Sequence, residues 1–232
     1  MNIFYQPRIP EGVLHLDEEE SRHCIKVLRR HSGDAIRLTD GKGKFYDALI
    51  TRESFRQCEF AITKTDQIPI PDFYIHLAIS PTKNADRIEW LVEKCVEIGI
   101  DSISLITCEH TERSFIKTER LVKVAISAMK QSIKATLPTI IGPLDVMSLI
   151  TSADETHRYI AHVDADNEIL LHHVAPCSGR YLILIGPEGD FSPTELAIAI
   201  ENKFQKVSLG PSRLRTETAG LAACHILNLI NQ

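Results

Sequence analysis

The sequence has few cysteines, no long hydrophobic run and no leader-like start. No apolar run approaches the roughly 20 residues that span a bilayer, and residues 1–10 lack the basic-then-apolar pattern of a signal peptide. None of the six cysteines forms a Cys-x-x-Cys pair, so we expect neither a zinc site nor a disulfide framework. These absences favour a folded cytoplasmic protein with reduced, mostly buried thiols and no bound metal.

The sequence also lacks an excess of basic residues. Its formal net charge of -5 argues against indiscriminate binding of nucleic acids. Residues 1–66 carry 11 basic and 11 acidic side chains, so the acidic excess lies wholly in the remainder of the chain. With 44% hydrophobic residues the chain can bury a core, and its 232 residues suit a small domain joined to a medium-sized one.

The first 66 residues have the short elements of a β-rich unit. We predict a basic helix-like stretch near residues 23–30, strands at 35–38, 45–50 and 59–62, and a glycine turn at 41–44. Ile68-Pro69-Ile70-Pro71 then interrupts regular hydrogen bonding, because proline lacks the amide donor and restrains its predecessor. We therefore place a boundary there and assign residues 1–68 and 72–232 to two domains.

From Phe73 onward, strands alternate with helices. Strands are predicted at residues 74–79, 102–107, 159–163, 181–185 and 206–209, and helices at 85–99, 118–134, 193–202 and 216–230. This alternation predicts an α/β fold with a mainly parallel sheet covered by helices on both faces. Ligands bind beyond the carboxyl ends of such strands, so glycine-rich loops there are the first candidates for a binding site.

Two such loops follow predicted strands. Gly186-Pro187-Glu188-Gly189-Asp190-Phe191 leads into Ser192, Pro193 and Glu195, which have the spacing of a capped helix start. The second loop runs from Ser208 to Gly220 and feeds the last helix. Taken alone, the first loop is equally well a simple turn. In the second loop, taken alone, Arg215 is better interpreted as a solvated surface charge and Thr216 or Thr218 as a helix cap. Their position at one sheet edge favours a joint ligand site.

With these loops the chain closely resembles the RsmE family, the 16S ribosomal RNA uridine-N3 methyltransferases of the SPOUT class. The family patterns G-P-E-G-G-F and L-G-x-x-I-L-R-x-E-T-A are similar to Gly186–Phe191 and Leu209–Ala219. Similar segments at residues 27–34, 94–99 and 111–114 extend the resemblance over essentially the whole chain. The chain departs from the pattern at Asp190, usually glycine, at Arg213, usually isoleucine, and at Lys130, where an acidic residue commonly precedes Gln-Ser.

The resemblance implies a SPOUT-type parallel sheet whose last strands and helix form a deep trefoil knot, a rare exception to unknotted chains, and a small N-terminal PUA-like β-barrel. It also implies an S-adenosylmethionine site, completed by the partner subunit of a homodimer. Leu209 and Leu214 are expected to sandwich the purine. The expected cofactor-binding residues are Leu184, Ile185, Gly186, Pro187, Glu188, Gly189, Ser208, Leu209, Gly210, Leu214, Arg215, Thr218 and Ala219.

Methylation of uridine N3 requires loss of a proton and alignment with a sulfonium methyl group, for which no metal is needed. We expect Arg215 to stabilise negative charge on the uracil oxygens, because a guanidinium offers a planar fork of donors. Glu188 and Glu217 compete for the role of proton acceptor, although either can instead pair with Arg215 or cap a helix. We interpret His162 as structural.

Two basic clusters are the expected contacts with 16S ribosomal RNA, because phosphate contacts supply affinity and positioning. They comprise Arg8, Arg22, Lys26, Arg29, Arg30, Arg113, Lys130 and Lys134. Either cluster can be a solvated face, but two of them in an acidic protein favour an N-terminal domain that docks RNA of the small ribosomal subunit.

Three alternatives remain open. The chain can be a SPOUT methyltransferase of transfer RNA or of another ribosomal position, or a non-catalytic RNA-binding module, against which the intact glycines of both loops argue. A Rossmann-type methyltransferase is disfavoured, because its glycine motif follows the first strand of the domain and Ser80-Pro81-Thr82-Lys83 has no glycine.

Overall fold

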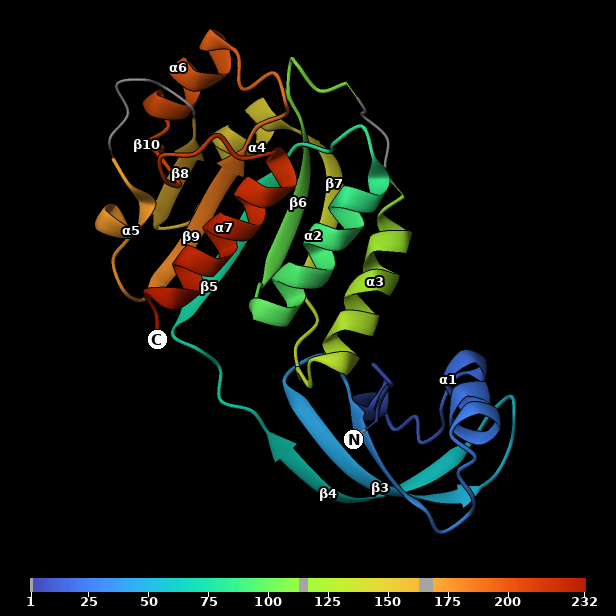
Figure 1. The fold of residues 1–232 in the computed structure, drawn as a ribbon. Coiled ribbons are helices and arrows are strands. Elements are labelled where there is room, and N and C mark those ends of the chain that lie inside the picture. The colour runs from blue at the N-terminus through green and yellow to red at the C-terminus, as the bar shows by residue number, and fades with distance from the viewer. Residues whose placement is uncertain (1, 113–116, 163–168) are drawn as a thin grey trace. The chain divides into compact units, whose positions relative to one another are not determined.

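The structure, a computed structural model, describes residues 2–112, 117–162 and 169–232 and contains two compact units (Figure 1). The first unit consists of Met1–Ile70 and Ile126–Leu137, and the second of Pro71–Ala125 and Pro138–Gln232. Helix α3, Thr118–Gln131, therefore begins in the second unit and ends in the first. Each unit is built from two separate stretches of the chain.

The first unit contains a four-stranded sheet in the order β1-β2-β3-β4. Its strands are β1 Ile3–Tyr5, β2 Ala35–Thr39, β3 Lys44–Arg52 and β4 Glu59–Gln67, with short helices η1 Ile9–Glu11, α1 Glu18–Arg22 and η2 His23–Val27. Strands β1 and β2 are parallel, and the other pairs are antiparallel. Alternate residues of the strands, together with Phe4 and Leu16, form one buried apolar cluster.

The predicted strands of this unit are confirmed, and β4 extends five residues beyond its predicted end, to Gln67. The predicted helix over 23–30 is too long, because the described helix η2 is a single π-helical stretch that ends at Val27. Arg29 has a left-handed φ of 53°, which no α-helix accommodates.

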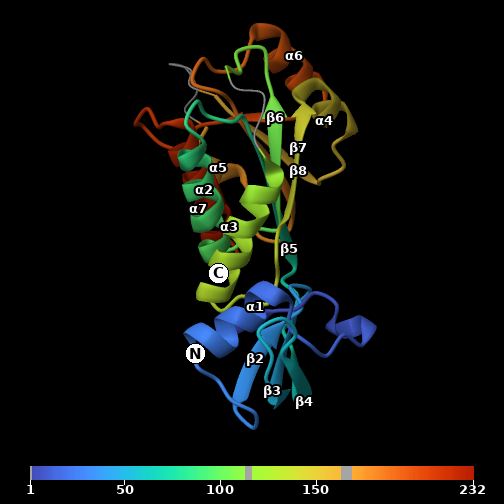
Figure 2. The same ribbon diagram turned by 90° about the vertical axis from the view of Figure 1, so that its right-hand side faces the viewer.

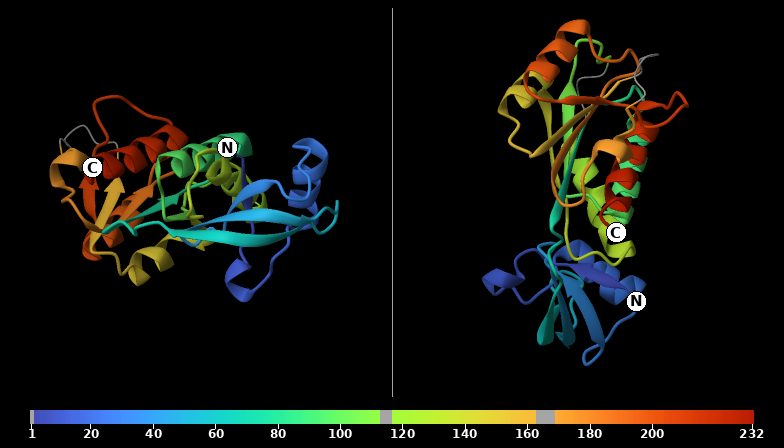
Figure 3. Two further views of the ribbon diagram at one scale, coloured as in Figure 1. Left: turned by 90° about the horizontal axis from the view of Figure 1, so that it is seen from below. Right: turned by 90° about the vertical axis from the view of Figure 1, so that its left-hand side faces the viewer.

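The second unit contains a six-stranded parallel sheet in the order β10-β8-β9-β5-β6-β7 (Figure 1). The strands are β5 Phe73–Ile79, β6 Ser102–Thr107, β7 Thr139–Asp145, β8 His157–Ala161, β9 Gly179–Ile185 and β10 Gln205–Val207. The helices, besides α3, are α2 Ala85–Ile98, α4 Val146–Ser152, α5 Leu171–Val174, α6 Pro193–Glu201 and α7 Thr216–Leu229. Helices α2 and α7 cover one face of the sheet, and α4 and α6 cover the other (Figures 2 and 3). The predicted α/β architecture with helices on both faces is confirmed.

Several boundaries in this unit differ from the sequence-based prediction. Strand β7 is absent from the prediction, because Gly142 and Pro143 lie within it. The structure accommodates Pro143, which has no amide donor, because β7 is an edge strand of the sheet. Helix α3 ends at Gln131 rather than at residue 134, since Ile133 has a left-handed φ of 57°. Strand β10 ends at Val207, and Ser208 makes only an isolated bridge to Leu170.

Close packing of α7 on the sheet depends on one glycine. A Cβ atom at Gly220 would lie 2.9 Å from Cδ1 of Ile79 and 3.2 Å from Cδ1 of Leu91. Those two side chains belong to β5 and α2 and are fully buried. Gly220 therefore lets α7 pack closely against both β5 and α2.

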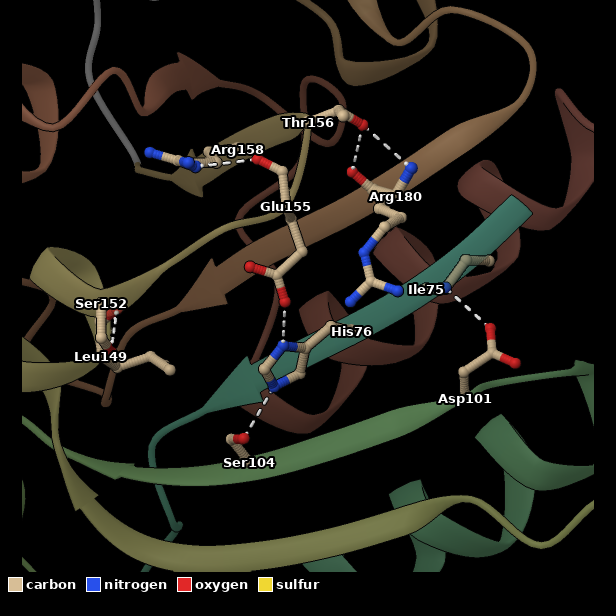
Figure 4. A network of polar contacts seen from close by, with 10 residues as sticks. All are labelled: Ile75, His76, Asp101, Ser104, Leu149, Ser152, Glu155, Thr156, Arg158 and Arg180. Atoms are coloured by element: carbon tan, nitrogen blue, oxygen red, sulfur yellow. Dashed lines mark hydrogen bonds and ion pairs between the residues drawn. The ribbon is translucent and has the colours of Figure 1, made fainter. Parts of the chain in front are cut away.

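A buried polar network crosses the sheet near the amino-terminal ends of its strands (Figure 4). Nδ1 of His76 lies 2.7 Å from Oε1 of Glu155, and Nε2 lies 2.7 Å from Oγ of Ser104. Burial alone would raise the pKa of Glu155, but the contact with His76, a backbone hydrogen bond and the nearby Arg180 together outweigh it, so the pKa is lowered. The network lies at the end of the strands opposite to the glycine-rich loops. None of the described helices is both long and apolar enough to cross a membrane.

Candidate functional site

Both predicted loops leave the carboxyl edge of the parallel sheet. Strand β9 ends at Ile185 and continues directly into the first loop, and β10 continues into the second. Strand β8 lies between β9 and β10, so one strand separates the two loops. Side chains from the loops after β5 and β6 complete this edge: Oγ of Ser80 lies 2.8 Å from Oγ1 of Thr111, and the amide of Ser80 donates to the carbonyl of Ile185 at 3.0 Å.

The first loop is a tight turn that is held from within. The amide of Asp190 donates to the carbonyl of Pro187 at 2.9 Å, and Asp190 has a left-handed φ of 62°. A Cβ atom at Gly186 would lie 3.1 Å from the buried ring of Phe191. Phe191 is part of the apolar cluster between the sheet and α4 and α6, which anchors the end of the loop in the core.

The exit of this loop is fixed by the predicted capping box. The amide of Ser192 donates to Oε2 of Glu195 at 2.7 Å, and the amide of Glu195 donates to Oγ of Ser192 at 3.3 Å. The other oxygen of Glu195 accepts from the amide of Glu109, in the loop after β6, at 2.8 Å. Helix α6 and two loops are therefore joined by one buried carboxylate.

The second loop is more open. Oγ of Ser208 accepts from the amide of Gly210 at 3.3 Å, and the amide and carbonyl of Ser208 bond to Ile169 and Leu171 at 2.7 and 3.0 Å. Gly210 has a φ of 133°, and a Cβ atom there would meet nothing within 4 Å. Leu209 and Leu214 are half-buried. This loop thus presents main-chain groups and apolar side chains next to open space.

The two loops are connected through Arg87, in the first turn of α2. Nε of Arg87 lies 3.7 Å from Oε1 of Glu217, and its Nη1 lies 4.0 Å from Oε1 of Glu188. Glu217 is buried in the first turn of α7, where the helix dipole favours a negative charge. Its Oε2 atom is buried and has no hydrogen-bond partner among the described residues.

A shallow pocket adjoins this cluster. It is lined by Asp86, Arg87, Trp90, Glu217 and Thr218. Trp90, the only tryptophan of the chain, keeps 41% of its surface exposed and lies one helical turn after Arg87. The pocket therefore combines an aromatic face, a cation and a buried carboxylate.

The predicted cofactor residues differ in what they expose. Leu184, Ile185, Gly186 and Pro187 are buried, and Ile185 already uses its carbonyl to bind Ser80, so only part of this strand end is free to contact a ligand. Glu188, Gly189, Arg215 and Thr218 are exposed, and Ser208, Leu209, Gly210, Leu214 and Ala219 are half-buried.

The structure brings Glu188 and Glu217 together, but their shared cation is Arg87 and not Arg215. Arg215 is the N-cap residue of α7, is exposed, and makes no ion pair with either glutamate in the part of the chain that the structure describes. The idea that Thr216 or Thr218 caps α7 is wrong, since Arg215 occupies that position and no side chain caps it.

Burial raises the pKa of Cys108, after β6, to about 12, so this thiol stays protonated.

Sequence reasoning missed Arg87, Trp90 and His110. Arg87 and Trp90 lie in the helix that follows β5, and the rule that ligands bind beyond strand ends points to them. The loop before that helix has no glycine, so it lacks the signal that marks the other two loops. Nδ1 of His110 lies 3.0 Å from the carbonyl of Asp190, and nothing in the sequence connects these two residues.

The predicted RNA contacts lie mainly in the first unit. Arg8, Arg22, Lys26, Arg29 and Arg30 are exposed. Arg22 and Lys26 line a surface hollow that also contains Glu18 and Glu19, and Arg22 pairs with Glu18 at 2.5 Å. Nζ of Lys130, in the part of α3 that belongs to this unit, lies 2.5 Å from Oε1 of the buried Glu20. Lys134 is half-buried, and Arg113 lies outside the described residues.

The fold and its two loops combine with family matches that place the chain in the class of RNA methyltransferases. The RNA methyltransferase domain family matches residues 69–228, and the RNA methyltransferase PUA domain family matches residues 16–63.

Similar proteins are known along the whole chain. A ribosomal RNA small subunit methyltransferase E of Aquifex aeolicus is 29% identical over 98% of this chain and 99% of its own length. A probable rRNA methyltransferase of Porphyromonas gingivalis, known as a crystal structure, is 43% identical with a TM-score of 0.92, over 100% of this chain and 98% of that one. The Neisseria gonorrhoeae methyltransferase E, crystallised with S-adenosyl methionine, is 28% identical with a TM-score of 0.89 over the same shares. The chain belongs to the RsmE family, the ribosomal RNA small subunit methyltransferases E.

Proposed function

We propose that this protein transfers the methyl group of S-adenosylmethionine to N3 of a uridine in 16S ribosomal RNA, on the assembled small subunit in the cytoplasm. The observation that carries this proposal is the pairing of two loops, Gly186–Phe191 and Ser208–Arg215, at the carboxyl edge of the sheet, with Arg87, Glu188 and Glu217 between them. The two loops contain the family patterns, and family members act on ribosomal RNA of the small subunit.

The residues at this edge fit the cofactor. Gly210 leaves open space where any side chain would project, and half-buried Leu209 and Leu214 offer the apolar surface that an adenine ring needs. The unpartnered oxygen of Glu217 is a buried acceptor suited to a hydroxyl or amino group of a ligand. Leu184, Ile185, Gly186, Pro187, Glu188, Gly189, Ser208, Arg215, Thr218 and Ala219 complete the proposed set. When bound, the cofactor supplies an electrophilic methyl group on a sulfonium centre.

Arg215 is placed to stabilise the anion of the target base. It is exposed at the start of α7, and the described carboxylates do not neutralise it. Its guanidinium can therefore donate hydrogen bonds to a uracil oxygen on which negative charge develops. Holding the base in line with the methyl group contributes further, because orientation removes entropy from the barrier.

Glu188 and Glu217 remain the two proposed proton acceptors. Glu188 is exposed and can reach a substrate, whereas Glu217 is buried and paired with Arg87. We assign the acceptor role to Glu188 and an orienting role to Glu217, because a carboxylate that receives a proton from N3 must touch the base. Glu188→Gln is then expected to lower kcat more than it weakens cofactor binding.

The first unit is proposed to dock RNA. Its sheet would close into the PUA-like barrel of residues 1–68. Arg8, Arg22, Lys26, Arg29, Arg30, Arg113 and Lys134 would contact phosphates, whereas Lys130 pairs with the buried Glu20. Residues 72–232 would form the methyltransferase domain, with the trefoil knot of the SPOUT class in its last strands and helix. We also propose a homodimer, because α7 exposes the apolar side chain of Leu229 and a second subunit would cover it.

Transfer of radiolabelled methyl groups tests the function directly. The purified protein is incubated with labelled S-adenosylmethionine and with small subunits, free 16S RNA or transfer RNA, each from cells that lack the enzyme. The modified nucleoside is identified by mass spectrometry. We expect label on small subunits, as 3-methyluridine, and none on transfer RNA.

Four outcomes would contradict the proposal in different ways. Label on transfer RNA would indicate another substrate, and a methyl group on a different atom would indicate another reaction. Binding of RNA without any transfer would indicate a non-catalytic module. An Arg215→Ala variant that binds the cofactor normally and keeps the wild-type rate would remove Arg215 from the mechanism.

A further inference from the structure

Asp190 occupies a backbone position that favours glycine. Its φ of 62° lies in the left-handed region, which is unfavourable for ordinary residues and which aspartate adopts with local support. That support is present, because Oδ1 of Asp190 accepts a hydrogen bond from the amide of Phe191 at 2.8 Å. The chain therefore keeps a glycine-like turn while carrying a carboxylate at its tip.

The second oxygen of this carboxylate has a partner on another strand. Oδ2 of Asp190 lies 2.8 Å from Nδ1 of His162, the residue that directly follows β8. The side chain of His162 is only 16% exposed, so the contact is partly shielded from water and from salt. Strand β8 is the immediate neighbour of β9, from which the loop of Asp190 leaves. The contact between His162 and Asp190 therefore joins two adjacent strand ends.

The main chain of Asp190 is held from the other side. Its carbonyl accepts from Nδ1 of His110 at 3.0 Å, and His110 lies in the loop after β6, two strands away from β9. A Cβ atom at Gly189 would lie 3.1 Å from Cβ of His110, which shows how closely the histidine packs against the loop. His110 and His162 thus clamp the tip of the loop between two neighbouring loops.

We propose that Asp190 is a positioning residue for cofactor binding: clamped by His162 and His110, it holds the main chain of Gly186–Gly189 in the conformation that receives S-adenosylmethionine. This inference rests on the proposed function of the loop. A glycine at position 190 would adopt the same φ but would have no carboxylate for His162. Cofactor affinity in this chain therefore depends on His162, a residue outside both cofactor loops.

The variants separate the charge from the backbone conformation. Asp190→Asn and Asp190→Gly both tolerate a left-handed φ, and both remove the carboxylate. His162→Ala removes its partner, whereas His162→Asn retains a nitrogen donor near the position of Nδ1. Lys203→Gly is the matched control, since Lys203 has a φ of 66° after α6 and takes no part in the loop.

Calorimetric titration of the full-length protein with S-adenosylmethionine, combined with steady-state kinetics, tests the clamp. We expect Asp190→Asn, Asp190→Gly and His162→Ala each to raise Kd and KM for the cofactor about tenfold, with kcat changed less than about twofold. The double variant His162→Ala/Asp190→Asn should be no weaker than either single variant, because both remove the same contact. His162→Asn should recover part of the affinity, and Lys203→Gly should bind like the wild type.

The results that overturn the clamp differ from those that overturn the function. Wild-type affinity in Asp190→Asn and His162→Ala, or additive losses in the double variant, would refute the clamp while leaving the methyltransferase assignment intact. A wild-type protein that binds no S-adenosylmethionine would refute both. Melting curves identify any variant that fails to fold, and Asp190→Asn, at a partly exposed loop position, then decides the result.

Discussion

Nε of Arg87 in α2 lies 3.7 Å from the buried carboxylate of Glu217 in the first turn of α7. This pair connects α2, the helix after β5, to the first turn of the last helix, and more than half of the chain separates the two residues. Arg87 is therefore the cation beside Glu217, a position for which the sequence offered Arg215 as a candidate. The second unit therefore has a positively charged contact at the start of α7 that leaves Arg215 available to a substrate.

Removal of Arg87 should destabilise the protein. In Arg87→Ala the carboxylate of Glu217 stays buried without its cation, so the free energy of unfolding should fall by about 1–3 kcal/mol. Glu217→Gln in the same background should restore part of the loss, because an amide is less costly to bury than an unpaired charge. Urea unfolding of the wild type, Arg87→Ala, Glu217→Gln and the double variant measures the coupling energy between the two side chains. Strictly additive effects would show that they act independently.

The stability of the second unit should depend on pH through Glu155. Its pKa is lowered from the usual 4.5, so its stabilising contribution is present above that value and is lost as the pH falls through the lower, folded-state pKa. Asp101 contributes with the opposite sign, because burial raises its pKa and its contribution is lost as the pH rises. The free energy of unfolding, measured by urea titration between about pH 3 and 6, should lose acid sensitivity in Glu155→Gln and gain it in Asp101→Asn. Parallel curves for the wild type and Glu155→Gln would rule out this role.

Lys130 should contribute more to stability than to RNA affinity. Its ammonium group pairs with Glu20, whose side chain is 9% exposed, so Lys130→Ala leaves that carboxylate without its cation. We expect a loss of about 1–3 kcal/mol in the free energy of unfolding, with little change in the salt dependence of RNA binding. Arg29→Ala/Arg30→Ala should instead leave stability within about 0.5 kcal/mol and reduce the slope of log K against log salt by about 2. Filter binding at several salt concentrations distinguishes the two cases, and a reduced slope for Lys130→Ala would contradict the assignment.

One thiol should react in the native protein. Of the six cysteines only Cys177 is exposed, and the other five are buried. A hydrogen bond with the thiol of Cys224, together with burial, raises the pKa of Cys95, which further protects Cys95 from thiol reagents. Titration with a chromogenic disulfide reagent should therefore give about one equivalent in buffer and all six in denaturant. Cys177→Ser should give none in buffer, and rapid release of a second equivalent would show that a buried pair opens readily.

The sequence is sufficient for the parallel sheet, for the two loops and for the capping box at Ser192, because each of these depends on local patterns. Hydrophobic periodicity locates β5, α2 and β9, and the order Ser192, Pro193, Glu195 describes the start of α6. Local patterns do not predict which charged residues face solvent and which pair with another side chain. Whether Arg87 or Arg215 faces Glu217 depends on how α2 packs against α7, which is a property of the tertiary structure.

The contact made by His162 also depends on the tertiary structure. The isolation of His162 in the sequence favours a structural role, yet its ring meets Asp190, a residue 28 positions later at the tip of a loop. The departure of Asp190 from the family glycine is visible in the sequence, but its partner becomes visible only when β8 and β9 are placed side by side. Nothing in the sequence indicates that Lys130 lies beside Glu20, since 110 positions separate them.

The division of α3 between the two units limits how this protein can be taken apart. Ala135, which follows α3, packs with Ile3 and Phe45 in a small buried cluster of the first unit, and its carbonyl accepts from Gly43 at 2.9 Å. Cleavage of the chain near residue 68 would leave residues 126–137 on the wrong fragment. Recombination at a single junction therefore could not exchange the first unit intact. The first unit and the catalytic unit are expected to evolve together.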